Sequence, residues 1–132
     1  MRVDDKALVE NQLSEQIIGA AIEVHKHMGP GLLESVYEEC LAYELNLRKI
    51  AFERQKPVPL HYKGLEVSEM LRLDQLIGGL VVVEIKSVQF LLPIHEAQLM
   101  TYLKLTGCKL GLLLNFNTAL LKDGIVRMAN HL

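Results

Sequence analysis

Two carboxylates and an amine lie near the middle of the chain, at Asp74, Glu84 and Lys86. Carboxylate oxygens are the ligands that hard divalent cations prefer. A lysine beside such a cation can orient a water molecule or stabilise a developing negative charge. Charges inside an apolar strand are costly unless they are paired or bind a metal. The three residues therefore indicate a metal site; the alternative interpretation is a salt-bridge cluster on a solvent-facing sheet surface.

The residues around this triplet predict a β-hairpin that would present it. Two apolar runs flank the pair Gly78-Gly79, a pattern typical of a tight turn between two strands. Strand side chains alternate between faces, so Glu84 and Lys86 are expected to share one face. Val83 and Ile85 are then expected to point to the other face.

The hydrophobic periodicity of the remaining chain predicts helices and short strands in a definite order. The expected helices are 11–28, 32–47 and 93–106, and the expected strands are 50–55, 58–62, 65–77, 80–87, 110–116 and 125–128. This order predicts an α/β fold, a mixed sheet flanked by helices. The third helix is long enough for a crossover, so the strands on either side of it are expected to be parallel neighbours.

Size and composition restrict the possible functions. The chain has 132 residues, which predicts a single domain over 1–132, and half of them are hydrophobic. The net charge of −2 carries no general basic signature. A nucleic acid would therefore be contacted through bound metal or a local basic patch. The best candidates for such a patch are Lys49, Arg54, Lys56, His61 and Lys63.

The cysteines and the terminal sequence exclude other classes. Cys40 and Cys108 are isolated from each other and from any Cys/His cluster, which argues against zinc or iron–sulfur sites. We expect both to be small buried hydrophobic residues. The charged start of the chain is followed by no apolar signal region, and no apolar run approaches the roughly 20 residues that span a bilayer. The expected location is cytoplasmic, with no membrane partner.

Asp74 followed by Glu84-Ile85-Lys86 resembles the D…ExK signature of the PD-(D/E)XK nuclease superfamily, without the proline that names it. The segment from Gly31 to Tyr37 resembles the GxxExxY motif of a small stand-alone branch. The resemblance runs from about residue 17 to 127. Further segments that fit this branch are His25, Gly29-Pro30-Gly31, Gln98 with Tyr102-Leu103, and 111–116.

The resemblance implies roles for the central triplet. Asp74 and Glu84 would hold Mg²⁺ or Mn²⁺ together with the backbone carbonyl of Ile85 and water. Lys86 would position or help deprotonate the attacking water and balance charge in the transition state. The implied reaction is hydrolysis of a phosphodiester by a metal-activated water.

The resemblance also implies that three more residues line the site. Glu34 matches the carboxylate of the first motif helix, which supplies an outer or second-metal contact. Gln98 and Tyr102 lie four apart on one helix face and would contact phosphate or the lysine. Each has a plainer interpretation, as a helix-start carboxylate for Glu34 and as polar bonds to the sheet for the other two. Tyr37 is expected to pack in the core, and His95 to be exposed.

Two functions fit these residues. A metal-dependent nuclease acting on nucleic acid, with DNA favoured, fits the complete D…ExK set. A non-catalytic module that binds nucleic acid or protein fits the low positive charge. No glycine-rich GK[ST] stretch is present, which excludes a P-loop, and no organic cofactor is expected. A short nuclease has little surface with which to grip a duplex, so a homodimer is a reasonable hypothesis.

Overall fold

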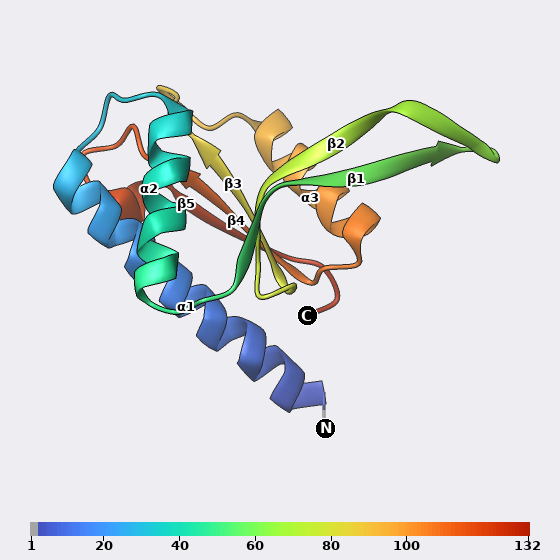
Figure 1. The fold of residues 1–132 in the computed structure, drawn as a ribbon, viewed down its shortest axis with the longest axis horizontal. Coiled ribbons are helices and arrows are strands. Elements are labelled where there is room, and N and C mark those ends of the chain that lie inside the picture. Colours follow the sequence, from blue (N-terminus) through green and yellow to red (C-terminus); the bar gives the residue numbers. More distant parts are fainter. Residues whose placement is uncertain (1–2) are drawn as a thin grey trace.

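The structure, a computed structural model, describes residues 3–132, and side chains from residue 9 onward (Figure 1). Three helices surround a five-stranded sheet, as the α/β prediction requires. The elements are α1 (Val3–Met28), α2 (Glu34–Leu47), β1 (Phe52–Tyr62), β2 (Leu65–Ile77), β3 (Val81–Lys86), α3 (Pro93–Thr106), β4 (Leu110–Asn115), the 3₁₀ turn η1 (Leu121–Gly124) and β5 (Ile125–Ala129).

The strands lie in the sheet in chain order, β1-β2-β3-β4-β5. β3 and β4 are parallel, with α3 as the crossover between them, and the other neighbours are antiparallel. The predicted parallel pair is therefore confirmed. The predicted hairpin is confirmed as well, because Gly78 and Gly79 both have positive φ and Leu80 N–H donates to the Ile77 carbonyl at 3.0 Å.

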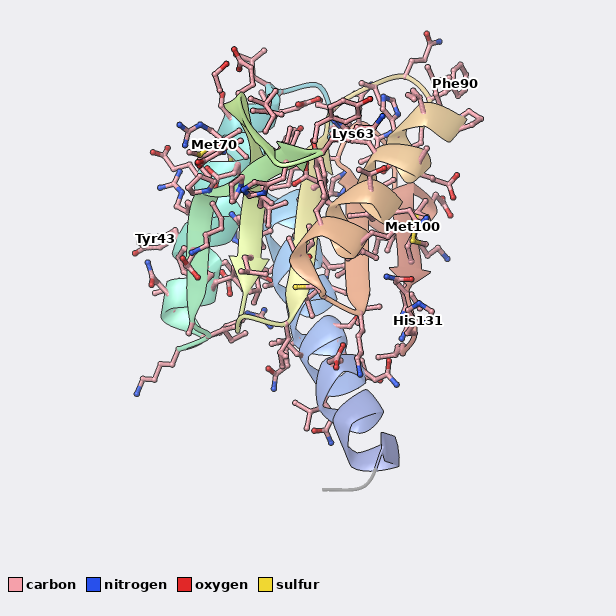
Figure 2. The ribbon with its side chains drawn as sticks, turned by 90° about the vertical axis from the view of Figure 1, so that its right-hand side faces the viewer. Tyr43, Lys63, Met70, Phe90, Met100 and His131 are labelled. Atoms are coloured by element: carbon pink, nitrogen blue, oxygen red, sulfur yellow. The ribbon has the colours of Figure 1, made fainter. Side chains whose placement is uncertain are left out.

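The two faces of the sheet are covered by different helices (Figures 1 and 2). α1 and α2 pack on one face, where Val81, Val83 and Ile85 of β3 belong to the larger core. α3 packs on the other face, together with Val82. Alternation along β3 thus turns Glu84 towards α3, away from Val83 and Ile85, as predicted.

β1 is one strand of 11 residues, so the prediction of two strands, 50–55 and 58–62, is wrong. The prolines at 57 and 59 suggested a break between them. β1 is an edge strand, however, and two prolines of the same parity direct their missing N–H groups away from β2. The sheet order, which the local sequence does not reveal, decides this point.

The far halves of β1 and β2 form an arm that bends away from the rest of the sheet and extends beyond it (Figure 1). The bend occurs near Gln55, whose φ of 50° lies in the left-handed region. Arg54 pairs with Gln75 and Lys56 with Leu73, so Gln55 and Asp74 face each other without a regular pairing. Kinks of this kind redirect side chains, and this one lies opposite Asp74, a residue expected to bind metal.

Three smaller predictions need correction. α1 begins at Val3 rather than near residue 11. α2 begins at Glu34 rather than residue 32, because Leu33 is still extended, with φ −71° and ψ 151°. Cys40 and Cys108 are half-buried rather than fully buried; each packs at the margin of one core.

Candidate active site

Asp74 and Glu84 meet where β2 and β3 separate. The pairing of these strands ends at Gln75 and Val83, one residue before the two acids. Beyond this point, carboxylate side chains replace backbone carbonyls as hydrogen-bond acceptors. The N–H of Asp74 donates to Glu84 Oε2 at 2.8 Å, and the N–H of Ile85 donates to Asp74 Oδ2 at 2.8 Å. Each carboxylate therefore satisfies a backbone donor that the ladder has left free.

The same separation exposes a backbone oxygen. The N–H and C=O of one strand residue point towards the same neighbouring strand. The Ile85 N–H points to Asp74, so the Ile85 carbonyl also faces the gap between β2 and β3. Ile85 lines the cavity at this gap. The residue predicted to lend its carbonyl to a metal thus lies beside the two predicted carboxylate ligands.

The two acids are in an environment that disfavours their charges. Burial and the charge of Asp74 raise the pKa of Glu84 to about 8, against an ordinary value of 4.5. Burial also raises the pKa of Asp74, while the Ile85 N–H and the charge of Lys86 act in the opposite direction. Neither acid forms a salt bridge with any residue that the structure describes. The pair therefore lacks a compensating cation at contact distance.

Glu34 is joined to the end of the β3 strand. Its Oε2 accepts the Ser87 N–H at 3.1 Å, and Ser87 Oγ donates to the Leu32 carbonyl at 2.6 Å. Glu34 is close enough that its charge raises the pKa of both Asp74 and Glu84. The first helical carboxylate thus lies beside the acid pair, as the sequence pattern suggested.

Tyr37 supports the loop that leads into Glu34. Its hydroxyl donates to the Gly29 carbonyl at 2.5 Å and accepts the Leu32 N–H at 3.1 Å. Its ring stacks on Phe116 with centroids 4.5 Å apart. The core position predicted for Tyr37 is confirmed. Its hydroxyl also holds the loop in place, which the hydrophobic periodicity of the sequence could not predict.

The two predicted residues of α3 differ in their placement. Tyr102 is buried, and burial together with the charges of Glu84 and Asp74 raises its pKa, so it lies within electrostatic range of both acids. The Gln98 side chain is exposed and forms no hydrogen bond to any residue that the structure describes. His95, expected to be exposed, is half-buried, and its Nδ1 accepts the Leu92 N–H at 3.0 Å, which caps α3.

Sequence reasoning missed a buried network beneath Asp74. Glu38, one turn after Glu34, accepts three hydrogen bonds from Arg54, at 2.6, 2.9 and 3.2 Å. Gln75 Nε2 donates to the same carboxylate at 2.8 Å. The available signals were the spacing of four between Glu34 and Glu38, which places both on one helix face, and the position of Gln75 next to Asp74.

A second missed residue is Asn115, at the end of β4. Its Oδ1 accepts the Val88 N–H at 3.1 Å and its Nδ2 donates to the Val88 carbonyl at 3.0 Å. This clamp holds the segment directly after Lys86. A polar residue at the end of an otherwise apolar strand was the signal in the sequence.

A small cavity of about 230 Å³ lies between α2 and the β1–β3 strands, beside Asp74. Its lining residues are Glu34, Ser35, Glu38, Gln55, Asp74 and Ile85. Within the described residues, no three His, Cys, Asp or Glu side chains are grouped so that they would hold a metal by themselves. The predicted ligand set needs only two carboxylates and a carbonyl, and the uncompensated acid pair has the charge and the oxygen atoms that a hard divalent cation requires. The donor set therefore fits such an ion.

The residues of the candidate basic patch do not all remain free: two of them form ion pairs, and one lies far out on the arm. Arg54 binds Glu38, and Lys56 Nζ lies 2.9 Å from Glu53. Lys63 lies at the tip of the arm (Figure 2), where its amine is 5.4 Å from the centre of the Tyr62 ring. Two of the five residues are therefore paired with carboxylates, and a third lies at the far end of the arm.

The fold and the paired acids define a nuclease-like α/β domain. A family model for the PD-(D/E)XK nuclease superfamily matches residues 11–128, and the chain belongs to this superfamily. Members of the superfamily generally use divalent metal ions and act on nucleic acid. Comparisons with curated proteins and with solved structures give no match. In the described part of the chain, no helix is both long enough and apolar enough to cross a membrane.

Proposed function

We propose that this protein is a metal-dependent nuclease that hydrolyses phosphodiester bonds. The observation that carries the proposal is the reciprocal arrangement of Asp74 and Glu84 at the end of the β2–β3 ladder. It places the buried Glu84 and the half-buried Asp74 side by side, next to the Ile85 carbonyl, and Asp74 and Ile85 line the cavity. Burying carboxylates without a compensating charge lowers the stability of the fold, which favours a functional reason for the arrangement.

The residues of the site have separate tasks in this proposal. Asp74, Glu84 and the carbonyl of Ile85 would hold Mg²⁺ or Mn²⁺. A divalent cation bound there lowers the pKa of a water molecule and supplies positive charge near the scissile phosphate. The charge of Lys86 acts on both acids, and its amine would orient the water and stabilise negative charge.

The surrounding side chains would shape the site. Glu34 is held by the Ser87 N–H and adds an acceptor for a water in the outer shell of the metal. Tyr102 is buried on the α3 side of the sheet within electrostatic range of both acids, and it would help to desolvate that side of the site. Gln98, exposed one turn earlier on the same helix, is available to a bound substrate.

A non-catalytic binding module is the second candidate. The division of the basic patch favours it, because a nuclease that follows a duplex usually needs several free cations along its path. The complete set of Asp74, Glu84 and Lys86 favours catalysis. A module that only binds has no need for a lysine next to two desolvated carboxylates.

The proposal is tested by combining calorimetry with cleavage assays. Mg²⁺ and Mn²⁺ are titrated into the wild type, Glu84→Gln and Lys86→Ala, and each protein is incubated with labelled single- and double-stranded DNA and RNA. Glu66→Gln, an exposed glutamate in the arm, is the matched control. We expect cleavage by the wild type and the control, abolished by chelator and by both site variants. Metal binding without cleavage of any substrate would support the binding module.

The proposal includes DNA as the substrate and a homodimer as the active form. Two copies would present two cavities to the two strands of a duplex. Gel filtration with light scattering at micromolar concentration tests the dimer, and a strict monomer with full cleavage activity would remove it.

A further inference from the structure

We propose that Arg54 forms a phosphate-binding subsite at the edge of the cavity, and that Glu38 is the residue that positions its guanidinium group. This inference rests on the proposed nuclease function. It adds to that function a specific contact with a phosphate of the substrate backbone.

The guanidinium group is held along one edge and free along the other. Glu38 receives hydrogen bonds from Nε and Nη2 of Arg54, which together form one side of the planar fork. In the described part of the chain, Nη1 has no hydrogen-bond partner. The Arg54 side chain is 45% exposed, whereas that of Glu38 is 10% exposed. Arg54 therefore keeps an open pair of donors facing solvent, in the geometry that binds phosphate oxygens in bidentate fashion.

The anchor for this fork lies inside the cavity. Glu38 lines the same cavity as Asp74, and its charge raises the pKa of Asp74. Gln75, the neighbour of Asp74 in β2, donates from Nε2 to the Glu38 carboxylate and also to its backbone carbonyl. β2 thus fixes Glu38 from one side and Arg54 from the other, because Arg54 pairs in register with Gln75.

This ion pair differs from the other pairs of the surface. Arg48–Glu44 and Lys56–Glu53 join residues three or four apart, and each rests on a single short contact. Such exposed pairs contribute little to stability. Arg54–Glu38 joins a strand to a helix, uses both carboxylate oxygens and has a third partner in Gln75. The hydrogen bond to Glu38 also raises the pKa of Arg54, so its charge is retained at any working pH.

Charge complementarity indicates which ligand this arrangement suits. Glu34, Glu38 and Asp74 line the cavity and Glu84 lies next to Asp74, so these carboxylates would repel an approaching phosphodiester. Lys86 and Arg54 offset two of the four charges, and the remaining excess equals one divalent cation. With that cation bound, the excess negative charge is offset, and the Nη1 side of the Arg54 guanidinium group, which Glu38 does not occupy, can donate to a phosphate. It is suited to a phosphodiester rather than to a neutral ligand.

The test compares two charge-neutral double variants. Glu38→Gln/Arg54→Gln removes the proposed subsite without leaving an unpaired buried charge, and Glu44→Gln/Arg48→Gln removes an ordinary ion pair of the same chemistry elsewhere. Arg54→Lys keeps the charge but loses the fork. Affinity for a labelled DNA oligonucleotide is measured by fluorescence anisotropy over a salt series in Mg²⁺, with Lys86→Ala in every protein to prevent cleavage, and kcat and KM are measured separately without that substitution.

We expect the subsite variant to bind roughly tenfold more weakly, which corresponds to about 1.4 kcal/mol. The slope of log affinity against log salt is expected to fall by about 0.9, the value of one lost phosphate contact. Both double variants leave the net charge of the protein unchanged. A difference between them in affinity and salt slope is therefore expected only if the subsite variant loses a phosphate contact. Arg54→Lys should raise KM with the slope retained, and the control pair should match the wild type.

An unchanged slope and affinity in a Glu38→Gln/Arg54→Gln protein with native circular dichroism would overturn the subsite. In that case the wild type would still cleave, so the proposed function would stand. A wild type that neither binds nor cleaves any nucleic acid would overturn both proposals.

Discussion

Asp74 and Glu84 each bind the backbone of the strand that carries the other acid. Glu84 Oε2 accepts the Asp74 N–H and Asp74 Oδ2 accepts the Ile85 N–H, both at 2.8 Å. The two acids thereby end the pairing of β2 with β3 and hold the gap open. The same bonds use only one oxygen of each carboxylate, Oε2 of Glu84 and Oδ2 of Asp74.

Asp74→Asn is expected to raise the stability of the protein and to lower its cleavage activity. The amide oxygen of asparagine can still accept the Ile85 N–H, while the repulsion with Glu84 disappears. We expect the free energy of unfolding at pH 8 to rise by about 1 kcal/mol and cleavage to fall by about 100-fold or more. Chemical denaturation and a cleavage assay measure the two effects. Asp123→Asn, on an exposed residue of η1, is the control and should change neither. A loss of stability in Asp74→Asn would show that the charge itself supports the fold.

The stability of the metal-free protein is expected to decrease as pH rises. The pKa of Glu84 is about 8 in the folded protein against an ordinary 4.5, so the folded state binds this proton more tightly. Its contribution to stability is complete below about pH 4.5 and is lost as pH approaches about 8. The loss amounts to a few kcal/mol, since one pKa unit corresponds to about 1.4 kcal/mol.

Denaturant unfolding at several pH values in chelator measures this effect, and Glu84→Gln is expected to flatten the profile. Because divalent cations compete with the same proton, Mg²⁺ affinity should weaken as pH falls below about 8. A wild type and a Glu84→Gln variant with superimposable pH profiles would contradict the assignment of this titration to Glu84.

Tyr37→Phe is expected to loosen the loop before Glu34 and leave the core intact. The ring keeps its stacking on Phe116, but the Gly29 carbonyl and the Leu32 N–H lose their shared partner. We expect a loss of about 1–2 kcal/mol in the free energy of unfolding, typical of a buried hydroxyl with two hydrogen bonds. Cleavage should fall several-fold through the position of Glu34. Tyr43→Phe, on an exposed tyrosine of α2 (Figure 2), should have no effect on either measurement.

Substitutions at Gln55 should report the backbone strain at the bend. A φ of 50° is unfavourable for residues with a Cβ and most unfavourable for β-branched ones. Gln55→Val is expected to cost about 1–2 kcal/mol, whereas Gln55→Gly should be neutral or stabilise by up to about 1 kcal/mol. Thermal unfolding of the two variants measures the difference. Equal effects of valine and glycine would indicate that Gln55 adopts an ordinary strand conformation.

Local sequence was sufficient for much of the fold. The Gly78-Gly79 hairpin, the start of the α3 helix at Pro93 and the parallel crossover follow from short patterns, because turns, caps and periodicity depend on neighbours in the chain. The D…ExK residues lie on that hairpin, and its two acids are only ten residues apart in the sequence. Their meeting was predictable for the same reason. The β1 strand was not, because two prolines are acceptable only on an edge that the sheet order defines.

Short stretches of the chain specify which groups are available: two acids and a lysine on a hairpin, a carboxylate at the start of a helix, and an apolar core of the right size. The packing of helices on the sheet brings Glu38 to Arg54, 16 residues away, and to Gln75, 37 residues away, next to the acid pair. It also decided that Asn115 clamps the segment after Lys86. The physical reason is that hydrogen bonds between distant segments depend on how helices and strands pack, and no short pattern encodes that packing.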